Sequence, residues 1–355
     1  MLPYFILLLM VVFLAFLGEN AKKSTKTYNF YKFLILLFLT LFAGLRSWRV
    51  GSDTSGYAHK FEDLNLDFSS FIELESKTEI GYRLLEYITS LFSNDYMLIL
   101  TVIALVAVFF QLKSIYKLSE QPVISIFILI TFGIYTYVFN GARQAIAAAI
   151  FMYAVTFLIK SDFRKYLFWV LVAFLFHKSV IFGLPLYFVF RRRFTFKWFI
   201  ILIIGAALAS FFFSLLFQFA GVVSERYSKY EEITTQGGAT LTLSYGLLCA
   251  FFILMRSKIE PIYLRSYDIY LNMFSFGTII FILVFFLGAY VEITRLAFYF
   301  ILSAIFIWPI IFKCLKQNEI FLFLVFFVLV HFTFYYIFVG KMAGLNPYIL
   351  NPIFN

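Results

Sequence analysis

Charge is the scarcest feature of this sequence. Only 14% of the 355 residues are charged, while 63% are hydrophobic. A soluble domain carries about 25% charged residues, and the apolar residues here recur in long blocks over the whole length. This composition excludes a soluble domain with one anchor. It predicts an all-helical, polytopic integral membrane protein.

Residues that hold metals or form disulfides are also scarce. The two cysteines, Cys249 and Cys314, lie in or beside apolar blocks, which excludes a disulfide framework. The sequence has no zinc-ligand spacing, no nucleotide motif and no glycine-rich phosphate-binding loop. We therefore expect no metal, no cofactor and no nucleotide-driven mechanism.

The formal net charge of +10 raises the question of a nucleic-acid partner. The basic residues lie in short loops between apolar blocks, where lysine and arginine orient membrane helices. Nucleic acid is therefore not an expected partner.

About ten apolar blocks have close to the roughly 20 residues that a helix needs to cross a bilayer. The first block has no basic segment before it and no cleavage site after it, so we interpret it as a retained helix rather than a signal peptide. The predicted spans are 2–17, 30–45, 96–112, 121–139, 143–159, 197–220, 241–256, 267–290, 293–312 and 318–339.

The block 166–190 differs from the others because His177 and Lys178 lie at its middle. It is either one long helix or a re-entrant pair of half-helices. With the segment 22–32 in the cytoplasm, the re-entrant course places most of the 29 basic residues on the inner side. A single span inverts every later loop, so the positive-inside rule favours the re-entrant pair.

This topology predicts one integral membrane domain over 1–355, with two sizeable segments outside the cytoplasm. The first is the loop 46–95, which contains a short amphipathic helix near 82–92 that we expect to lie on the membrane surface. The second is the C-terminal tail 340–355.

The unusual polar residues gather at the predicted outer face. Because the positive-inside rule disfavours arginine there, each outer arginine needs another reason for its place. Arginine forms bidentate bonds to phosphate, and converging arginines suit a lipid pyrophosphate. The candidate substrate-binding residues are Arg46, Arg49, Arg143, Gln144, Lys178, Arg226, Arg295 and Tyr299, and the candidate catalytic residues are Asp53 and His177.

Plainer interpretations stand beside these. A single arginine at a helix end is more often an anchor whose head reaches the interface. Asp53 could pair with Arg49 or cap a turn. His177 could have a structural hydrogen-bonding role, although ionisable groups at membrane depth are costly and usually functional.

A set of motifs runs in order over nearly the whole chain. It begins with Arg46-x-x-Arg49-Val50-Gly51-Ser52-Asp53-x-x-x-Tyr57-x-x-x-Phe61 and continues with Glu79-x-Gly81-Tyr82. Arg143-Gln144 before an alanine-rich helix, His177-Lys178-Ser179 and Arg295-x-x-x-Tyr299 follow. This ordered set resembles the EpsG family, in which threonine or glycine often precedes the aspartate where Ser52 stands here.

The resemblance implies a Wzy-type polymerase of undecaprenyl-pyrophosphate-linked oligosaccharide repeat units. Such an enzyme is a multi-pass protein of the bacterial cytoplasmic membrane that acts at the outer face to build an O-antigen, capsule or exopolysaccharide. It needs a base for the acceptor hydroxyl and positive charge for the departing pyrophosphate. Asp53 is slightly preferred to His177 as the base. Expected partners are the lipid-linked oligosaccharide, the bilayer, and a chain-length regulator and flippase of the same pathway.

Two rival functions stay open at this stage. A ligase-type transferase of lipid-linked glycan uses the same arginines and differs in its product. A flippase of the lipid-linked unit needs charges at several depths and often has helix repeats, whereas the charges here lie at one predicted face and no repeat is visible.

Overall fold

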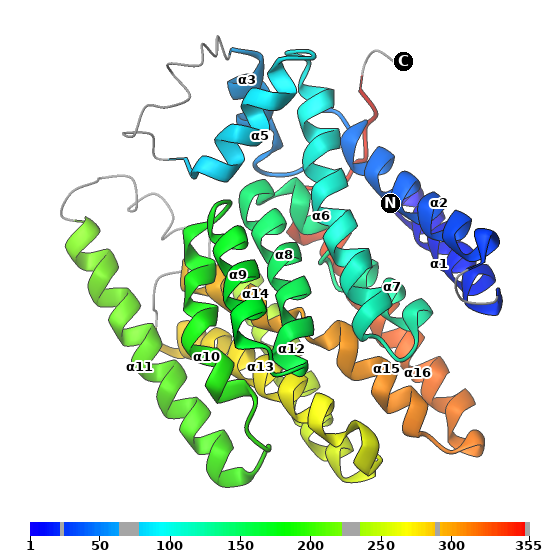
Figure 1. The fold of residues 1–355 in the computed structure, drawn as a ribbon, viewed down its shortest axis with the longest axis vertical. Coiled ribbons are helices and arrows are strands. Elements are labelled where there is room, and N and C mark those ends of the chain that lie inside the picture. Colours follow the sequence, from blue (N-terminus) through cyan, green and yellow to red (C-terminus); the bar gives the residue numbers. More distant parts are fainter. Residues whose placement is uncertain (22–24, 64–77, 222–234, 288–291, 352–355) are drawn as a thin grey trace. The chain divides into compact units, whose positions relative to one another are not determined.

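The computed structural model describes residues 1–21, 25–63, 78–221, 235–287 and 292–351, and its regular elements in these ranges are helices (Figure 1). It divides into two compact units, Met1–Ile181 with Lys316–Asn355, and Phe182–Leu315.

The first unit contains most of the predicted site. Its helices are α1 (Leu2–Asn20), α2 (Lys26–Gly44), α3 (Thr54–Glu62), α5 (Ile80–Ser90), α6 (Tyr96–Leu118), α7 (Pro122–Thr131), η1 (Thr136–Phe139), α8 (Ala142–Ile159), α9 (Phe163–Phe174), η2 (Lys178–Phe182, which ends at the boundary), α16 (Gln317–Ile337) and η5 (Phe338–Met342). The second unit contains α10 (Gly183–Phe190), α11 (Phe196–Gly221), α12 (Thr235–Met255), η4 (Arg256–Lys258), α13 (Pro261–Leu287), α14 (Glu292–Ile301) and α15 (Ala304–Cys314).

Nine helical segments of the described chain are long and apolar enough to cross a membrane. They are Leu2–Asn20, Lys26–Gly44, Tyr96–Leu118, Pro122–Phe139, Ala142–Ile159, Gly238–Lys258, Pro261–Phe286, Ile293–Cys314 and Gln317–Lys341. The helix α11 covers the predicted span 197–220. The prediction of a polytopic helical bundle is confirmed.

Small residues allow the helices of the first unit to pack closely. The alanine-rich α8 is buried along most of its length and packs against α6 and α9. At the crossing of α2 and α6, a Cβ added to Gly44 would lie 2.8 Å from the Thr101 Cα. Membrane helices lack a strong hydrophobic drive to associate, so such close backbone contact stabilises their packing.

In the second unit, α13 packs against α11, α12 and α14. Two polar interactions fix its first half. The Arg256 guanidinium forms a bidentate pair with Asp268, at 2.6 and 2.9 Å, and the buried Asn272 amide donates to the carbonyls of Phe190 and Arg192. The end of α10 is thereby tied to α13.

The block 166–190 is broken at its middle, as two half-helices require. The helix α9 ends at Phe174, and a short 3-10 turn from Lys178 leads into α10. The polar residues His177 and Lys178 therefore lie where the helix is interrupted. The return of the second half toward the inner side remains a prediction.

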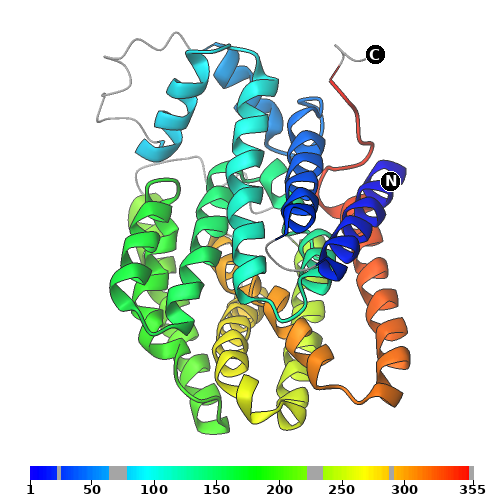
Figure 2. The same cartoon turned by 45° about the vertical axis from the view of Figure 1, so that its right-hand side comes forward.

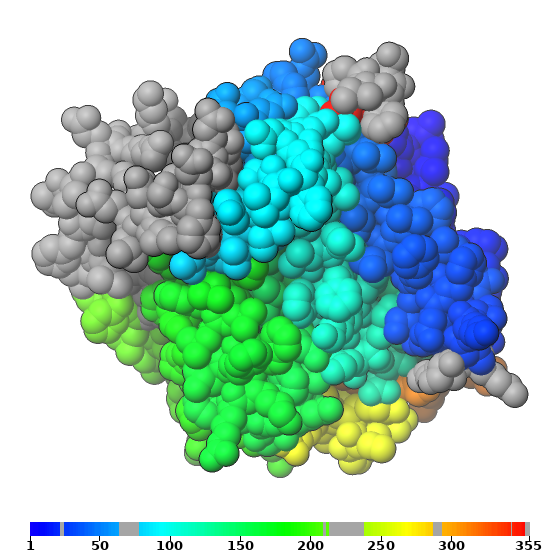
Figure 3. Space-filling model, turned by 45° about the horizontal axis from the view of Figure 1, so that its top comes forward, coloured from blue at the N-terminus to red at the C-terminus, as the bar shows by residue number. Residues whose placement is uncertain are grey.

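The helix α5 covers most of the segment near 82–92. Its buried face carries Tyr82, Glu86 and Thr89, while Leu84 and Ile88 are exposed. Figure 3 shows α5, in cyan, at the surface of the molecule. An outward apolar face suits a helix on a membrane surface, although that location remains a prediction.

Candidate functional site

The first motif, Arg46–Asp53, is a turn that follows α2 and is held by the C-terminal segment. The Ser47 N–H donates to the Ile349 carbonyl at 2.8 Å, and the Gly51 N–H donates to the Gly344 carbonyl at 2.9 Å. Figure 2 shows this red segment beside the blue α2. Residues about 300 positions apart in the chain thus build one wall of the site.

The same turn is joined to the loop before α8. Gly51 has φ +100°, and a Cβ there would lie 2.7 Å from the Phe139 carbonyl oxygen, so glycine is required. The Ser52 N–H donates to the Asn140 Oδ1 at 2.9 Å, and the Asn140 amide donates to the Ala343 carbonyl at 2.8 Å. Asn140 therefore bridges the motif and the C-terminal segment.

Arg46 points into the protein and its side chain is 2% exposed. The guanidinium donates to the carbonyls of Ala43 and Val50 and to the Thr54 hydroxyl, and it lies 4.1 Å from the centre of the Phe139 ring. Burial lowers the pKa of Arg46 to about 10. These contacts give Arg46 a role in holding the turn.

Arg49 and Asp53, by contrast, are exposed. The Arg49 guanidinium lies 5.1 Å from the Trp48 ring centre, a cation–π contact that leaves its donors accessible. Asp53 precedes α3 without capping it through its side chain, and its Oδ1 accepts the Ser52 hydroxyl at 3.0 Å. Both side chains are accessible to a ligand.

Arg143 opens α8 and forms an ion pair with Glu79. Its side chain is 32% exposed and that of Glu79 is 9% exposed. Arg143 also hydrogen-bonds the Tyr57 side chain. A guanidinium has five N–H donors, so an arginine held in this way keeps donors for an anion.

Glu79 connects this arginine to the break after α9. Its second oxygen accepts the Lys178 N–H at 3.4 Å, and the nearby Gly81 N–H donates to the Leu175 carbonyl at 2.8 Å. A Cβ at Gly81 would lie 2.7 Å from that carbonyl oxygen. The second, third and fourth motifs therefore meet around one carboxylate.

Two further predicted residues have local partners. The His177 Nδ1 lies 2.7 Å from the Ser179 hydroxyl, which fixes the ring beside the exposed Lys178. Gln144 is buried, and its amide oxygen accepts the Tyr137 hydroxyl at 2.7 Å. Gln144 thus holds the loop before α8, while His177 stays at the edge of the site.

A second buried carboxylate lies on the inward face of α5. Glu86 is 2% exposed and pairs with the Lys60 ammonium at 3.4 Å. Burial raises the pKa of Glu86, and Lys60 opposes this shift. The buried Tyr82 hydroxyl has no hydrogen-bond partner in the described part of the chain, and burial raises its pKa.

The remaining predicted residues lie in the second unit or outside the described residues. Arg295 is exposed and Tyr299 is buried, one helical turn apart on α14 of the second unit. Arg226 lies outside the described residues. The structure therefore brings Arg49, Asp53, Arg143, His177 and Lys178 to the same end of the first unit, and it places Arg46 and Gln144 in the supporting interior.

Glu79 is the functional candidate that the sequence interpretation left out of the site. The sequence marks Glu79 as the first residue of the Glu79-x-Gly81-Tyr82 motif, but no local pattern indicates that Arg143 is its partner. The two residues are 64 positions apart.

The helices define a multi-pass membrane protein in which motifs from distant parts of the chain converge on an arginine–carboxylate pair. The EpsG family model matches residues 29–350, and the chain belongs to this family of Wzy-type polysaccharide polymerases. Neither the curated proteins nor the solved structures give a match. Family membership indicates a glycosyltransferase-type polymerase of polysaccharide.

Proposed function

We propose that this protein polymerises undecaprenyl-pyrophosphate-linked oligosaccharide repeat units at the outer face of the bacterial cytoplasmic membrane. The observation that carries the proposal is the Arg143–Glu79 pair, in which a part-exposed guanidinium is fixed where three family motifs meet. A pyrophosphate is the anion that such a planar, multi-donor cation binds well.

The reaction joins two lipid-linked glycans. A hydroxyl at the non-reducing end of the new repeat unit attacks the anomeric carbon of the growing chain, whose bond to the pyrophosphate oxygen breaks. The hydroxyl proton passes to a base, and the lipid pyrophosphate leaves with the electron pair. The cleaved sugar–pyrophosphate bond supplies the energy, so the step needs no nucleotide.

The residues that the structure describes take roles that follow from their exposure. Arg143 and Lys178, with Arg49, bind the pyrophosphate and stabilise the charge that grows on it as the bond breaks. Arg226 and Arg295 are proposed for the second lipid pyrophosphate, with Tyr299 supporting Arg295. Arg46 and Gln144 hold the walls of the site.

The base is Asp53 or His177, with Asp53 preferred. Its carboxylate is exposed, and its Oδ1 accepts the hydroxyl of the neighbouring Ser52. An ionised carboxylate is available as a base at neutral pH. His177, whose Nδ1 lies within hydrogen-bond distance of the Ser179 hydroxyl, is the second candidate.

The test uses the purified protein in liposomes with a synthetic lipid-pyrophosphate-linked repeat unit, matched to the host polysaccharide. A ladder of products spaced by one repeat unit is expected. Arg143→Ala should lower kcat about a hundredfold or more, and Asp53→Asn should lower it by about two orders of magnitude. Arg164→Ala, which removes an exposed arginine from the start of α9, is the matched control.

Other outcomes identify the rival functions. Transfer of intact glycan to a different acceptor, without a ladder, indicates a ligase. Movement of the intact lipid-linked unit across the liposome membrane, without new glycosidic bonds, indicates a flippase. Full activity of Asp53→Asn excludes Asp53 as the base and leaves His177→Gln as the next variant.

A further inference from the structure

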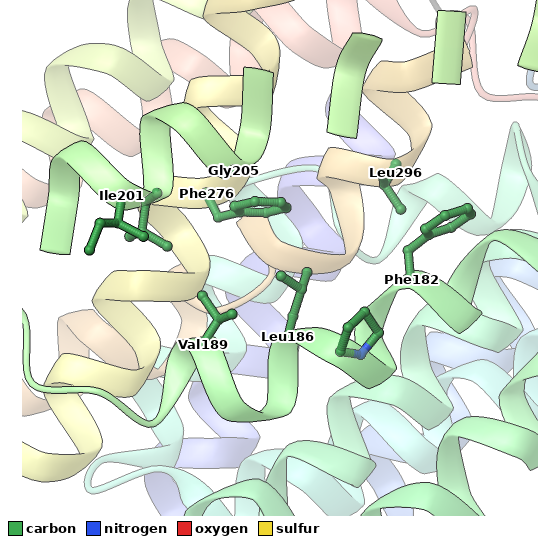
Figure 4. A pocket seen from close by; sticks show the side chains of 9 residues that line it. Phe182, Leu186, Val189, Ile201, Gly205, Phe276 and Leu296 are labelled. Carbon is green, nitrogen blue, oxygen red and sulfur yellow. The ribbon is translucent and has the colours of Figure 1, made fainter. Parts of the chain in front are cut away.

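The second unit contains an apolar cavity of about 180 Å³, and no residue to which chemistry has been assigned lines it (Figure 4). Nine side chains or backbone positions line it, all from apolar residues of α10, α11, α13 and α14 and from Phe182 just before α10. A cavity without polar lining selects hydrocarbon rather than sugar or phosphate.

One side of the cavity is open and the opposite side is closed. Ile201, which is 50% exposed, lies at the mouth with Pro185 and Gly205. Leu202 and Phe276 are buried at the floor. Because the mouth lies on apolar membrane helices, a chain within the bilayer can enter it sideways.

Gly205 lines the cavity and contributes no side chain to it. A Cβ added there would have no heavy atom within 4 Å, so a side chain at this position would extend into open space. Close helix packing does not explain this glycine, in contrast to Gly44. Its effect is to leave room in the wall that α11 contributes.

An exposed cation precedes one of the lining residues in the chain. The floor residue Leu296 lies on α14, and the preceding residue Arg295 is exposed in the first turns of that helix. An apolar cavity with a neighbouring exposed guanidinium matches a molecule with a hydrocarbon chain and an anionic head. A free phosphate or a free sugar matches only one of these features.

We propose that this cavity binds an isoprene segment of the polyprenyl chain of the lipid-linked substrate, an inference that rests on the proposed function. An apolar cavity of about 150 Å³ holds one benzene molecule, so this cavity has room for about one isoprene unit. The methyl branches of a polyprenyl chain fill such a space with lateral contacts that a straight acyl chain lacks.

The test compares two glycine variants that differ only in their place. Gly205→Phe fills the cavity, while Gly246→Phe on α12 adds the same side chain at another helical glycine with open space around its Cβ. Ile201→Trp, which narrows the mouth from α11, provides a second filling variant in case Gly205→Phe fails to fold.

Two assays are measured for each variant. The first is polymerisation with a long polyprenyl-linked repeat unit and with an analogue shortened to two isoprene units. The second is retention of undecaprenyl phosphate against phosphatidylglycerol, by native mass spectrometry of protein released from nanodiscs. The second assay does not depend on turnover.

The expected result is a KM for the long-chain substrate that rises about tenfold or more in Gly205→Phe, with little change for the shortened analogue and none for Gly246→Phe. Undecaprenyl phosphate should be retained selectively by the wild type and lost from Gly205→Phe. Equal retention of phosphatidylglycerol would mean an ordinary lipid contact and overturn the proposal.

The two levels of the proposal fail in different ways. If the wild type forms a product ladder and the KM values of Gly205→Phe and Ile201→Trp equal that of the wild type, only the cavity assignment is ruled out. If the wild type forms no ladder from any matched substrate, the proposed function is ruled out, and the cavity assignment with it.

Discussion

At the residue scale, the central interaction of the candidate site is the Glu79–Arg143 pair. Glu79→Gln should lower kcat on the order of tenfold to a hundredfold, because the guanidinium loses the charge that orients it. The binding of substrate should change less than kcat, since the arginine itself remains. Steady-state kinetics with the lipid-linked repeat unit separate the two parameters.

Lys165→Gln is the control for this variant. It removes a solvent-exposed ion pair with Asp162 at 3.0 Å, at the opposite end of α9 from His177, and such pairs contribute little to stability. A wild-type kcat in Glu79→Gln would show that Arg143 does not depend on its carboxylate partner.

Arg46 separates a structural from a substrate-binding role. Arg46→Ala leaves buried acceptors without a donor, so the free energy of unfolding should fall by about 3 kcal/mol. A lower melting temperature in detergent and less monodisperse protein would record this. If the variant is instead as stable as the wild type and inactive, Arg46 binds substrate directly.

Glu86 provides a pH-dependent prediction. Burial raises its pKa above the ordinary value of 4.5, so the folded state favours the protonated form and loses stability as the pH rises through the raised pKa. Glu86→Gln cannot ionise and avoids this loss. The melting temperature of the variant should exceed that of the wild type at pH 7, and the difference should be smaller at pH 4. An equal difference at both pH values contradicts the raised pKa.

At the element scale, α5 exposes apolar side chains and buries a charged one, the reverse of what a helix in a soluble loop does. Its exposed face includes Leu84 and Ile88, and its buried face includes the ion-paired Glu86. This arrangement suits a helix whose exposed face contacts lipid. The outer loop would then be anchored to the bilayer near the motifs that it carries.

An environment-sensitive fluorophore tests this orientation. In a background where Cys249 and Cys314 are serine, a probe attached to Ile88→Cys should have blue-shifted emission in liposomes, because it enters the interface. The same probe on Glu62→Cys, at the exposed end of α3, should report water. Matching emission from the two positions would place α5 away from the bilayer.

The elements followed from the sequence more fully than the site did. Apolar blocks of span length predicted the membrane helices because a bilayer imposes that length, and the polar pair His177-Lys178 marked the break after α9. Local pattern, however, carries no information on which way Arg46 points. Nor does it reveal contacts between distant segments, such as Ser47 with Ile349 or Arg143 with Glu79.

At the scale of the whole molecule, the C-terminal segment has a role that composition did not suggest. It contributes backbone acceptors to the first motif at Ser47 and Gly51 and a backbone donor to Leu45, and the Tyr348 ring stacks on Phe42 at 4.2 Å. The predicted outer tail is therefore part of the wall of the candidate site. The motif 46–53 and the tail must accordingly lie on the same side of the membrane.

The direction of the chain through the bilayer decides whether the motifs share that side. The re-entrant course from 166 to 190 returns the loop at Arg193 to the cytoplasm, whereas a single span exports it. In the cysteine-free background, a membrane-impermeant maleimide applied to intact spheroplasts should label Ser93→Cys in the outer loop and fail to label Glu120→Cys between α6 and α7. Arg193→Cys, the decisive position, should remain unlabelled until the membrane is permeabilised. Ser93, Glu120 and Arg193 are all exposed, so labelling reports the side of the membrane and not burial. Labelling of Arg193→Cys before permeabilisation would mean a single span. A single span moves Arg295 to the inner side and removes it from the proposed pyrophosphate site.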